Sequence, residues 1–392
     1  MTFSIASTAF HLDRELMLRL WSAASASARK PVAVLLRTRL VSAACAPHSI
    51  DDYLELFDRT WSLRKIRARI IAVRAERGDA TSLWLAPNEN WRSFRAGQYV
   101  RLSVRIGGVR YDRCFSLSSA PSDRELRLTI RRLPGGRVGE WAATAAHAGG
   151  VVELSQACGD FVLPEPVPPR LLFISAGSGI TPVMSLLRQL SHDRHTGEIT
   201  CLHYARNEVI FDQELAEIAR RLPALRFVPC LTRPDARDLT RARVRFSLEQ
   251  LQTHAPGWAD SETFVCGPAA LEAEVSALYG ARGLADRLHV ERFVPALAPD
   301  AFGGGDPVRC RLVFASSGRA VDGHARTSLL DQAERAGLQP AHGCRMGICH
   351  TCKCKKLSGV VRNQLTGAIS SEPGEEIQLC ISTPQSDVTL DL

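Results

Sequence analysis

The feature that most constrains this chain is a run of cysteines near the end of the sequence. The segment HGCRMGICHTCKC, residues 342–354, contains four cysteines and two histidines. Three of the cysteines follow the spacing Cys344-x4-Cys349-x2-Cys352, and Cys380 lies downstream. This spacing is typical of plant-type [2Fe–2S] sites and differs from the paired C-x2-C of zinc knuckles. We therefore predict that these four cysteines bind a [2Fe–2S] cluster, in preference to a zinc ion or disulfides.

A metal-binding role agrees with the compartment that we expect. Asp13, Arg14 and Glu15 interrupt the N-terminus before any long apolar segment, which is unlike a secretory signal. No apolar run approaches the roughly 18 to 20 residues that cross a bilayer. We expect a cytoplasmic protein, in which most of the 12 cysteines stay reduced.

The first 62 residues are expected to form a helical extension with a basic character. Residues 1–50 hold six lysines and arginines against two acidic residues, and the whole chain has a net charge of +8. Two interpretations stay open for this segment: a peripheral contact with an anionic membrane or acidic partner, and a solvated helix packed on the body. No recognition motif accompanies the charge and aromatic residues make up only 6%, so nucleic acid is not expected as a partner.

The next part of the chain has the hydrophobic period of strands. Residues 100–106 and 126–133 alternate apolar and polar side chains with a period of two, between glycine and proline turns. Short alternating strands of this kind predict an antiparallel β-barrel, which we place over residues 63–167.

From residue 168 the pattern changes. Apolar runs such as RLLFISA alternate with helical stretches such as PVMSLLRQL, which predicts a doubly wound parallel sheet over residues 168–295. A linker rich in proline and glycine follows at 296–307, and a small domain with the cysteines occupies 308–392. The chain is thus expected to be a multidomain α/β and β protein.

The last domain resembles a plant-type ferredoxin of the β-grasp fold from residue 308 to the end. TSLLDQAERAG matches the helix that leads into the cluster loop of such proteins. The resemblance agrees with the four ligands predicted from spacing. Cys354 is expected to point away from the cluster, and His342 and His350 are expected to be polar loop residues.

YDRCFSLSSAP, residues 111–121, resembles the R-x-Y-S flavin motif of the ferredoxin–NADP reductase superfamily. The resemblance implies that Arg113 contacts the flavin pyrophosphate, Phe115 packs on the isoalloxazine and Ser116 approaches N5. Phe115 stands where the family has tyrosine, which keeps the ring and removes a hydroxyl. GGRVGEW is similar to the family's second flavin-phosphate loop, and the resemblance implies phosphate contacts from Gly136, Val138 and Gly139.

SAGSGITPVMSLLR is similar to the nicotinamide-domain signature of the same family. A buried strand ends at its start, and a helix follows the small residues Gly177 and Gly179. Small residues let a dinucleotide pyrophosphate approach the amide groups of a helix N-terminus. We expect Thr181 to cap this helix and Pro182 to occupy its first position.

Two further segments match the family. In FVCGP, the resemblance places Cys266 beside the nicotinamide carbon that gives up hydride, followed by Gly267 and Pro268. In VERF, it places Glu291 and Phe293 at the border of the flavin. The expected catalytic residues are Ser116, Cys266, Glu291 and Phe293.

The preference between the two nicotinamide nucleotides rests on one segment. CLTRPD places Thr232 and Arg233 where NADPH-using members of the family have Ser-Arg against the 2′-phosphate. Arginine binds phosphate oxygens in a bidentate manner, and Arg206 is expected to assist. We expect NADPH.

The resemblance therefore implies an NADPH-dependent reductase with FAD and a [2Fe–2S] cluster, which passes electrons to a partner protein; FMN in place of FAD and the oligomeric state stay open. DDYLELFDRTWSLRKIRARI is similar to the segment before the flavin domain in bacterial reductases of membrane acyl-lipid desaturases and related di-iron oxygenases. A desaturase is the expected partner. The alternatives are the reductase of a Rieske-type or haem oxygenase, and a redox sensor.

Overall fold

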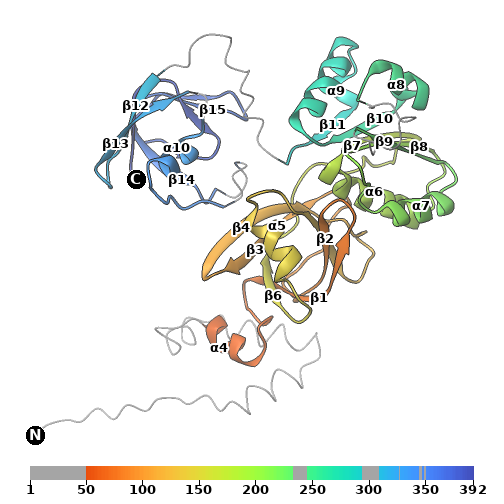
Figure 1. Cartoon of the computed structure of the whole chain (residues 1–392), viewed down its shortest axis with the longest axis horizontal. Coiled ribbons are helices and arrows are strands. Elements are labelled where there is room, and N and C mark those ends of the chain that lie inside the picture. The colour runs from red at the N-terminus through yellow and green to blue at the C-terminus, as the bar shows by residue number, and fades with distance from the viewer. Residues whose placement is uncertain (1–49, 233–244, 294–308, 326, 344–346, 348–349) are drawn as a thin grey trace, which may run out of the picture.

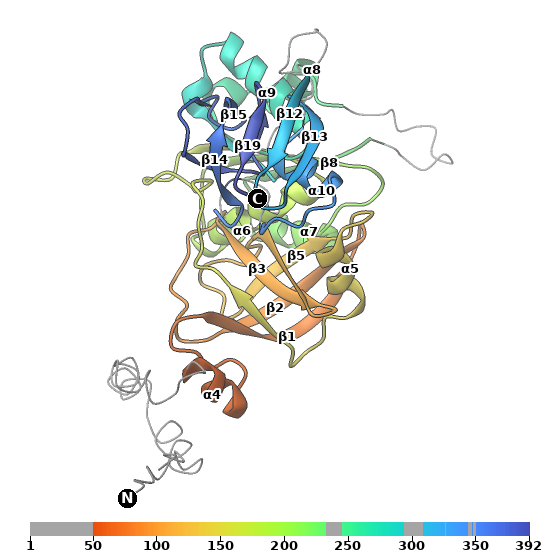
Figure 2. The same ribbon diagram turned by 90° about the vertical axis from the view of Figure 1, so that its left-hand side faces the viewer.

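The computed structural model describes three domains that follow one another along the chain, in residues 50–232, 245–293, 309–325, 327–343, 347 and 350–392. Figure 1 shows a barrel in orange and yellow, a parallel-sheet domain in green and cyan, and a C-terminal domain in blue. Figures 1 and 2 both place the last two at the same end of the barrel, opposite to helix α4 (Ile50–Phe57). The predicted linker at 296–307 and residues 1–49 lie outside the described residues. Within the described part, no helix is long and apolar enough to cross a membrane.

The first domain is a closed antiparallel sheet with the strand order β4-β3-β6-β1-β2-β5. In β3, Val100, Leu102 and Val104 point into the core, as the alternation predicts. A bridge between Leu117 and Leu128 joins the two outer strands and closes the barrel. The elements are β1 (Ile66–Glu76), β2 (Ala80–Pro87), β3 (Tyr99–Ile106), β4 (Val109–Ser116), β5 (Leu126–Arg131), α5 (Arg137–Thr144) and β6 (Val151–Leu154).

The second domain is a five-stranded parallel sheet with the order β11-β10-β7-β8-β9. Its strands carry large apolar side chains on both faces; in β7, Phe173 packs with α6 and α7, and Ile174 packs with α8 and α9. The elements are β7 (Arg170–Ala176), η1 (Gly177–Gly179), α6 (Ile180–His192), β8 (Glu198–Ala205), α7 (Asp212–Arg221), β9 (Leu225–Leu231), α8 (Leu248–His254), η2 (Trp258–Asp260), β10 (Glu262–Cys266), α9 (Ala269–Ala281), η3 (Ala285–Arg287) and β11 (Leu288–Glu291). This confirms the predicted doubly wound sheet.

The third domain combines a five-stranded sheet, in the order β13-β12-β19-β14-β17, with a three-stranded sheet. The predicted helix is α10 (Leu329–Arg335), and the Ser328 hydroxyl caps it by accepting from the Asp331 amide at 3.1 Å. The strands are β12 (Arg309–Phe314), β13 (Arg319–His324), β14 (Lys353–Ser358), β15 (Val361–Asn363), β16 (Ile369–Ser370), β17 (Glu376–Gln378), β18 (Ser382–Pro384) and β19 (Val388–Leu390).

Two expectations need correction. Thr181 does not cap the helix, because α6 already begins at Ile180 and the Thr181 hydroxyl donates to the Ser178 carbonyl at 2.9 Å. Pro182 consequently lies in the third position of the helix. Strand β5 was expected to alternate, but Leu126 to Ile130 are all buried, because its outer face packs against the second domain through Arg127.

A buried lysine connects strand β14 to two other segments of the third domain. Lys356 in β14 is 0% exposed, and its Nζ donates to the Gly359 carbonyl at 2.8 Å and to the Glu372 carbonyl at 2.7 Å. Replacing Lys356 by methionine keeps the volume but leaves both carbonyls without this donor. We expect Lys356→Met to lower the free energy of unfolding of this domain by about 2 to 4 kcal/mol, measured by urea denaturation. Lys355→Met, on the exposed face of the same strand, is the matched control and should unfold like the wild type. Equal unfolding of the two variants would contradict this prediction.

Candidate active site between the barrel and the parallel sheet

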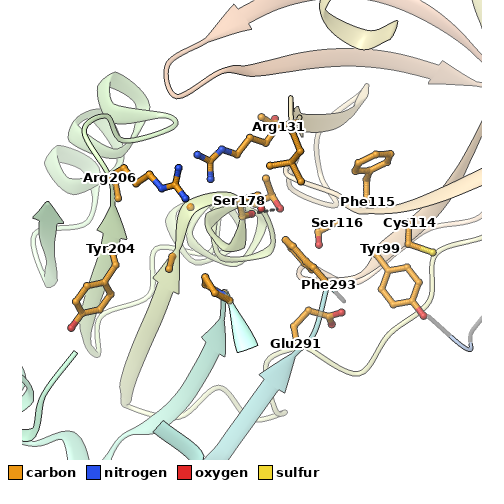
Figure 3. Close-up of a pocket in the computed structure, with 18 of the residues that line it drawn as sticks. Tyr99, Cys114, Phe115, Ser116, Arg131, Ser178, Tyr204, Arg206, Glu291 and Phe293 are labelled. Carbon is orange, nitrogen blue, oxygen red and sulfur yellow. Dashed lines mark hydrogen bonds between the residues drawn. The ribbon is translucent and has the colours of Figure 1, made fainter. Parts of the chain in front are cut away.

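A cavity of about 640 Å³ lies between the barrel and the parallel-sheet domain. Its walls come from both domains, at the carboxyl ends of the parallel strands, where doubly wound sheets bind their ligands. Figure 3 shows the side chains that line it. The cavity brings together most of the residues that the sequence singled out for the flavin and the nicotinamide.

On the barrel side, the end of β4 supplies Arg113, Phe115 and Ser116. Ser116 is only 3% exposed, and its Oγ has no hydrogen-bond partner among the described residues. A buried hydroxyl is costly unless a ligand completes its hydrogen bonding. Ser116 therefore fits a position against a polar ring atom of a bound cofactor.

On the opposite side, a loop of small residues connects β7 to α6. Gly177 lies in the left-handed region with φ +55°, and a Cβ on Gly179 would stand 2.0 Å from the Cys266 carbonyl oxygen. Only glycine fits at the second position. No side chain caps α6, so the amide groups of its first turn stay available to an anionic ligand. The loop suits a dinucleotide pyrophosphate, and both Gly177 and Thr181 line the cavity.

The end of β10 and the two residues after it lie partly in the core and partly at the cavity. Gly267 and Pro268 line the cavity, but Cys266 is 0% exposed and is absent from the lining. Burial raises the pKa of the Cys266 thiol well above its ordinary value, and the Glu291 and Glu272 carboxylates raise it further. A protonated, covered thiol is a poor nucleophile, and it is the backbone carbonyl of Cys266 that faces the glycine loop.

Glu291 and Phe293 lie at the same end of the cavity as Ser116. Burial raises the pKa of Glu291 to about 7, with smaller contributions from the Glu272 and Asp160 carboxylates. Burial also raises the pKa of Glu272 to about 7, although Arg292 opposes this from 3.5 Å. Glu272 was not predicted, because a glutamate inside α9 looks like an ordinary surface residue of a helix.

The loop at 136–139 does not line the cavity. Val138 and Gly139 are buried where α5 packs on the barrel, and a Cβ on Gly139 would stand 3.0 Å from the Arg131 carbonyl oxygen. Gly136 precedes the helix, and the nearby Leu133 is part of the lining instead. The structure thus explains Gly139 by close packing.

Two arginines reach the cavity from opposite walls. Figure 3 shows Arg131 of β5 and Arg206, which follows β8, extending toward one another. Arg131 Nη1 lies 2.9 Å from the position of a Cβ on Gly177, above the glycine loop. Arg131 was missed because it is the last residue of an alternating strand. Thr232 also lines the cavity, whereas Arg233 lies outside the described residues.

The structure describes two of the four predicted cluster ligands. Cys352 and Cys380 are 2% and 3% exposed, and their sulfurs lie 3.1 Å apart. Cys344 and Cys349 lie outside the described residues. Gly347 has φ +76°, and a Cβ there would stand 2.7 Å from Ile381 Cδ1, so the loop needs glycine at this place.

The neighbouring polar residues agree with their expected roles. The Cys354 thiol donates to the Asp391 carbonyl, with the two atoms 3.6 Å apart. His342 Nδ1 lies 3.0 Å from the Pro340 carbonyl oxygen. The paired thiols and the tight loop fit an iron–sulfur cluster.

One hydrogen bond connects the cluster loop to the cavity. Arg113 Nη1 donates to the Gly343 carbonyl at 3.0 Å, and Gly343 directly precedes the first predicted ligand. Arg113 also lines the cavity. The cluster loop therefore meets the barrel at the rim of the candidate flavin site.

Comparisons with known proteins agree with this arrangement. Residues 173–277 match the oxidoreductase NAD-binding domain, and residues 314–385 match the 2Fe-2S iron-sulfur cluster binding domain. An NADPH oxidoreductase of Mycobacterium tuberculosis is 36% identical, over 87% of this chain and 88% of the relative. A glycine betaine monooxygenase reductase subunit of Chromohalobacter salexigens is 29% identical, over 85% of this chain and 97% of the relative.

Solved structures show the same fold. The cytochrome P450 reductase of Amycolatopsis is 31% identical with a TM-score of 0.52, over 59% of this chain and 71% of that protein. Phthalate dioxygenase reductase has a TM-score of 0.57 at 22% identity, over 84% of this chain and 98% of that protein, which shows the fold alone. The chain belongs to the ferredoxin–NADP reductase-like family of oxidoreductases, in the group that joins a flavin barrel and a nicotinamide domain to a [2Fe–2S] domain.

Proposed function

We propose that this protein takes a hydride from NADPH at the cavity and delivers single electrons, through FAD and the cluster, to an oxygenase. The observation that carries the proposal is the cavity itself. It places the buried Ser116 hydroxyl opposite the glycine loop, and Arg113 at its rim holds the cluster loop. When bound, flavin accepts two electrons as hydride and releases them singly, which a [2Fe–2S] cluster requires.

The side chains divide the work of binding. Phe115 offers a ring face on which the isoalloxazine packs, and Ser116 supplies a hydroxyl at the reacting edge. Arg113, whose Nη1 donates to the Gly343 carbonyl, is also proposed to hold the flavin phosphate with its guanidinium. Gly136, Val138 and Gly139 act through the packing and backbone of their loop. Glu291 and Phe293 close the end of the cavity and exclude water from the site of transfer.

NADPH is the proposed donor because the nucleotide end of the cavity is cationic. Arg206 and Arg131 extend into it, and Thr232 is also part of the cavity lining. Guanidinium groups pair well with phosphate oxygens. The printed name of the mycobacterial relative also specifies NADPH. Arg233 lies outside the described residues, so its proposed contact with the 2′-phosphate rests on the sequence alone.

The proposed acceptor is the oxygenase component of a Rieske-type or haem system. The similar proteins include reductase components of a glycine betaine monooxygenase and of a 3-ketosteroid-9-alpha-monooxygenase, and a cytochrome P450 reductase. These names support the alternative over the desaturase that we expected from the N-terminal segment. The membrane contact expected for residues 1–49 lies outside the described residues.

Removal of one cluster ligand should separate the two halves of the electron path. We expect Cys380→Ser to keep FAD and NADPH–ferricyanide activity, and to lower cytochrome c reduction at least about tenfold, because disturbing a metal centre costs that much or more. Steady-state assays and iron content measure this. Cys354→Ser, whose thiol bonds to the Asp391 carbonyl, is the control that keeps the cluster. Loss of both activities in a flavin-loaded Cys380→Ser protein would contradict the electron order. A wild type that reduces neither acceptor would favour the redox sensor.

The glycine loop gives a second test. A Cβ at Gly179 would collide with the Cys266 carbonyl, so Gly179→Ala must shift the backbone that faces the nucleotide. Strain of about 1 to 3 kcal/mol should lower kcat/KM for NADPH by roughly 5- to 150-fold. Gly280→Ala, in α9 where a Cβ meets nothing within 4 Å, is the control and should keep wild-type kinetics. A Gly179→Ala enzyme with wild-type kinetics would show that the loop does not bind the nucleotide.

The acceptor is tested by reconstitution. We expect NADPH-driven reduction of a Rieske or haem oxygenase component from the same genome to be faster, at equal concentration, than that of a membrane desaturase. The visible spectra of the acceptors and stearoyl desaturation report the rates. Support of desaturation alone would refute the oxygenase assignment and restore the desaturase.

A further inference from the structure

A group of charges joins the barrel to the parallel-sheet domain, with two largely buried arginines and a glutamate, Glu214, whose side chain is 38% exposed. Arg127 of β5 is 5% exposed, and its guanidinium donates to both carboxylate oxygens of Glu214 at 2.8 and 2.9 Å. It also donates to Glu76 of β1 at 2.6 Å. Arg188 of α6 donates to the same Glu214 and to the Ser118 carbonyl. We call Glu76, Arg127, Arg188 and Glu214 the Arg127 cluster.

The charges of this cluster are balanced across the two domains. Glu214 belongs to α7 of the parallel-sheet domain and bridges an arginine of each domain. Burial alone would raise the pKa of Glu214, but Arg188 and Arg127 outweigh it and hold this pKa below its ordinary value. The carboxylate is thus ionised at neutral pH, and hydrogen bonds from both arginines hold it in place.

An aromatic residue in a strained conformation completes the interface. Phe211, just before α7, has φ +65° and is only 3% exposed. This region is unfavourable for a phenylalanine, so the surroundings must hold it there. Its ring lies 4.9 Å from the Arg127 guanidinium and 5.5 Å from that of Arg188. The Arg127 guanidinium also lies 4.4 Å from the centre of the Trp84 ring, so aromatic rings of both domains contact it.

The cluster is connected to both walls of the cavity. Arg188 holds Ser118, two residues after Ser116, and the Ser185 hydroxyl donates to the neighbouring Ser119 carbonyl at 2.6 Å. Both Arg188 and Ser185 lie on α6, which begins directly after the glycine loop. On the barrel side of the cavity, Arg127 lies in the same strand, β5, as Arg131, which lines the cavity.

A contribution to the stability of the interface does not by itself explain why charged residues are found there. The desolvation of buried charges offsets much of their attraction, so apolar residues would stabilise the interface as well. Charge-assisted, directional bonds from two arginines to one carboxylate instead specify one geometry between two surfaces. Hydride transfer depends steeply on such geometry, since the reacting atoms must approach to about 3 to 3.5 Å.

We infer that the Arg127 cluster is a positioning device, which fixes the gap between the glycine loop and Ser116 for hydride transfer. The inference rests on the nicotinamide-to-flavin reaction proposed above. The cluster acts through the two cavity walls and touches neither cofactor site directly.

The test compares two glutamines on one helix. Glu214→Gln keeps the shape but removes the charge that bridges the domains. We expect it to lower the rate of flavin reduction at saturating NADPH by about 10- to 100-fold, with the KM for NADPH within about twofold of wild type. Glu217→Gln removes an exposed partner of Arg221 on the same helix and should change neither value.

A second readout does not depend on activity. In Glu214→Gln, hydrogen–deuterium exchange should become faster in peptides 76–84 and 208–218, which form the two sides of the interface, and Glu217→Gln should leave it unchanged. Arg127→Lys keeps the charge but cannot hold Glu214 and Glu76 together, and should slow flavin reduction at least about fivefold. It provides the test if Glu214→Gln fails to fold.

The outcomes separate the inference from the function on which it rests. A wild type whose flavin NADPH does not reduce overturns the proposed function. A competent wild type with unchanged rates in Glu214→Gln, or in Arg127→Lys where the first variant does not fold, overturns the positioning role. A raised KM with an unchanged saturating rate overturns it also, because the cluster would then act on nucleotide binding.

Discussion

The candidate active site depends on one close approach of backbone to backbone. The glycine loop passes so near to the end of β10 that a Cβ on Gly179 would stand 2.0 Å from the Cys266 carbonyl oxygen. This approach brings the ends of β7 and β10 together and makes the floor of the cavity from main chain and small side chains. A flat ligand can lie on such a floor, and the first amides of α6 face its phosphates. The barrel then closes the cavity with Phe115 and Ser116.

Charged side chains distinguish the two ends of the cavity. Arg131 and Arg206 occupy one end, and Glu291 lies at the other beside Ser116 and Phe293. This arrangement supports the proposal that a dinucleotide binds with its phosphates toward the arginines. Because burial raises the pKa of Glu291 to about 7, this carboxyl carries less than a full charge at neutral pH, which limits its repulsion of an anionic nucleotide. The cluster loop reaches the rim through Arg113 and Gly343, which supports the proposal that electrons enter and leave at different places.

Patterns that depend on neighbouring residues could be read from the sequence. The period of two in β3, the apolar strands of the parallel sheet and the helix α10 all appear as expected, because each follows from which face of a local element is buried. Residues whose role depends on a distant partner could not. Arg127 looks like an outward side chain of an alternating strand, yet Glu214, its partner, lies 87 residues away. The capping role of Thr181 was wrong because the short η1 turn lets α6 begin two residues earlier.

The central claim is that electrons pass from the nicotinamide site to the cluster within one molecule, across the rim marked by Arg113. Anaerobic stopped-flow mixing of the FAD- and cluster-loaded protein with one equivalent of NADPH tests it most directly. The account predicts that flavin absorbance falls first and cluster absorbance follows, at a rate independent of protein concentration. A cluster that bleaches before the flavin, or at a rate proportional to protein concentration, would contradict it.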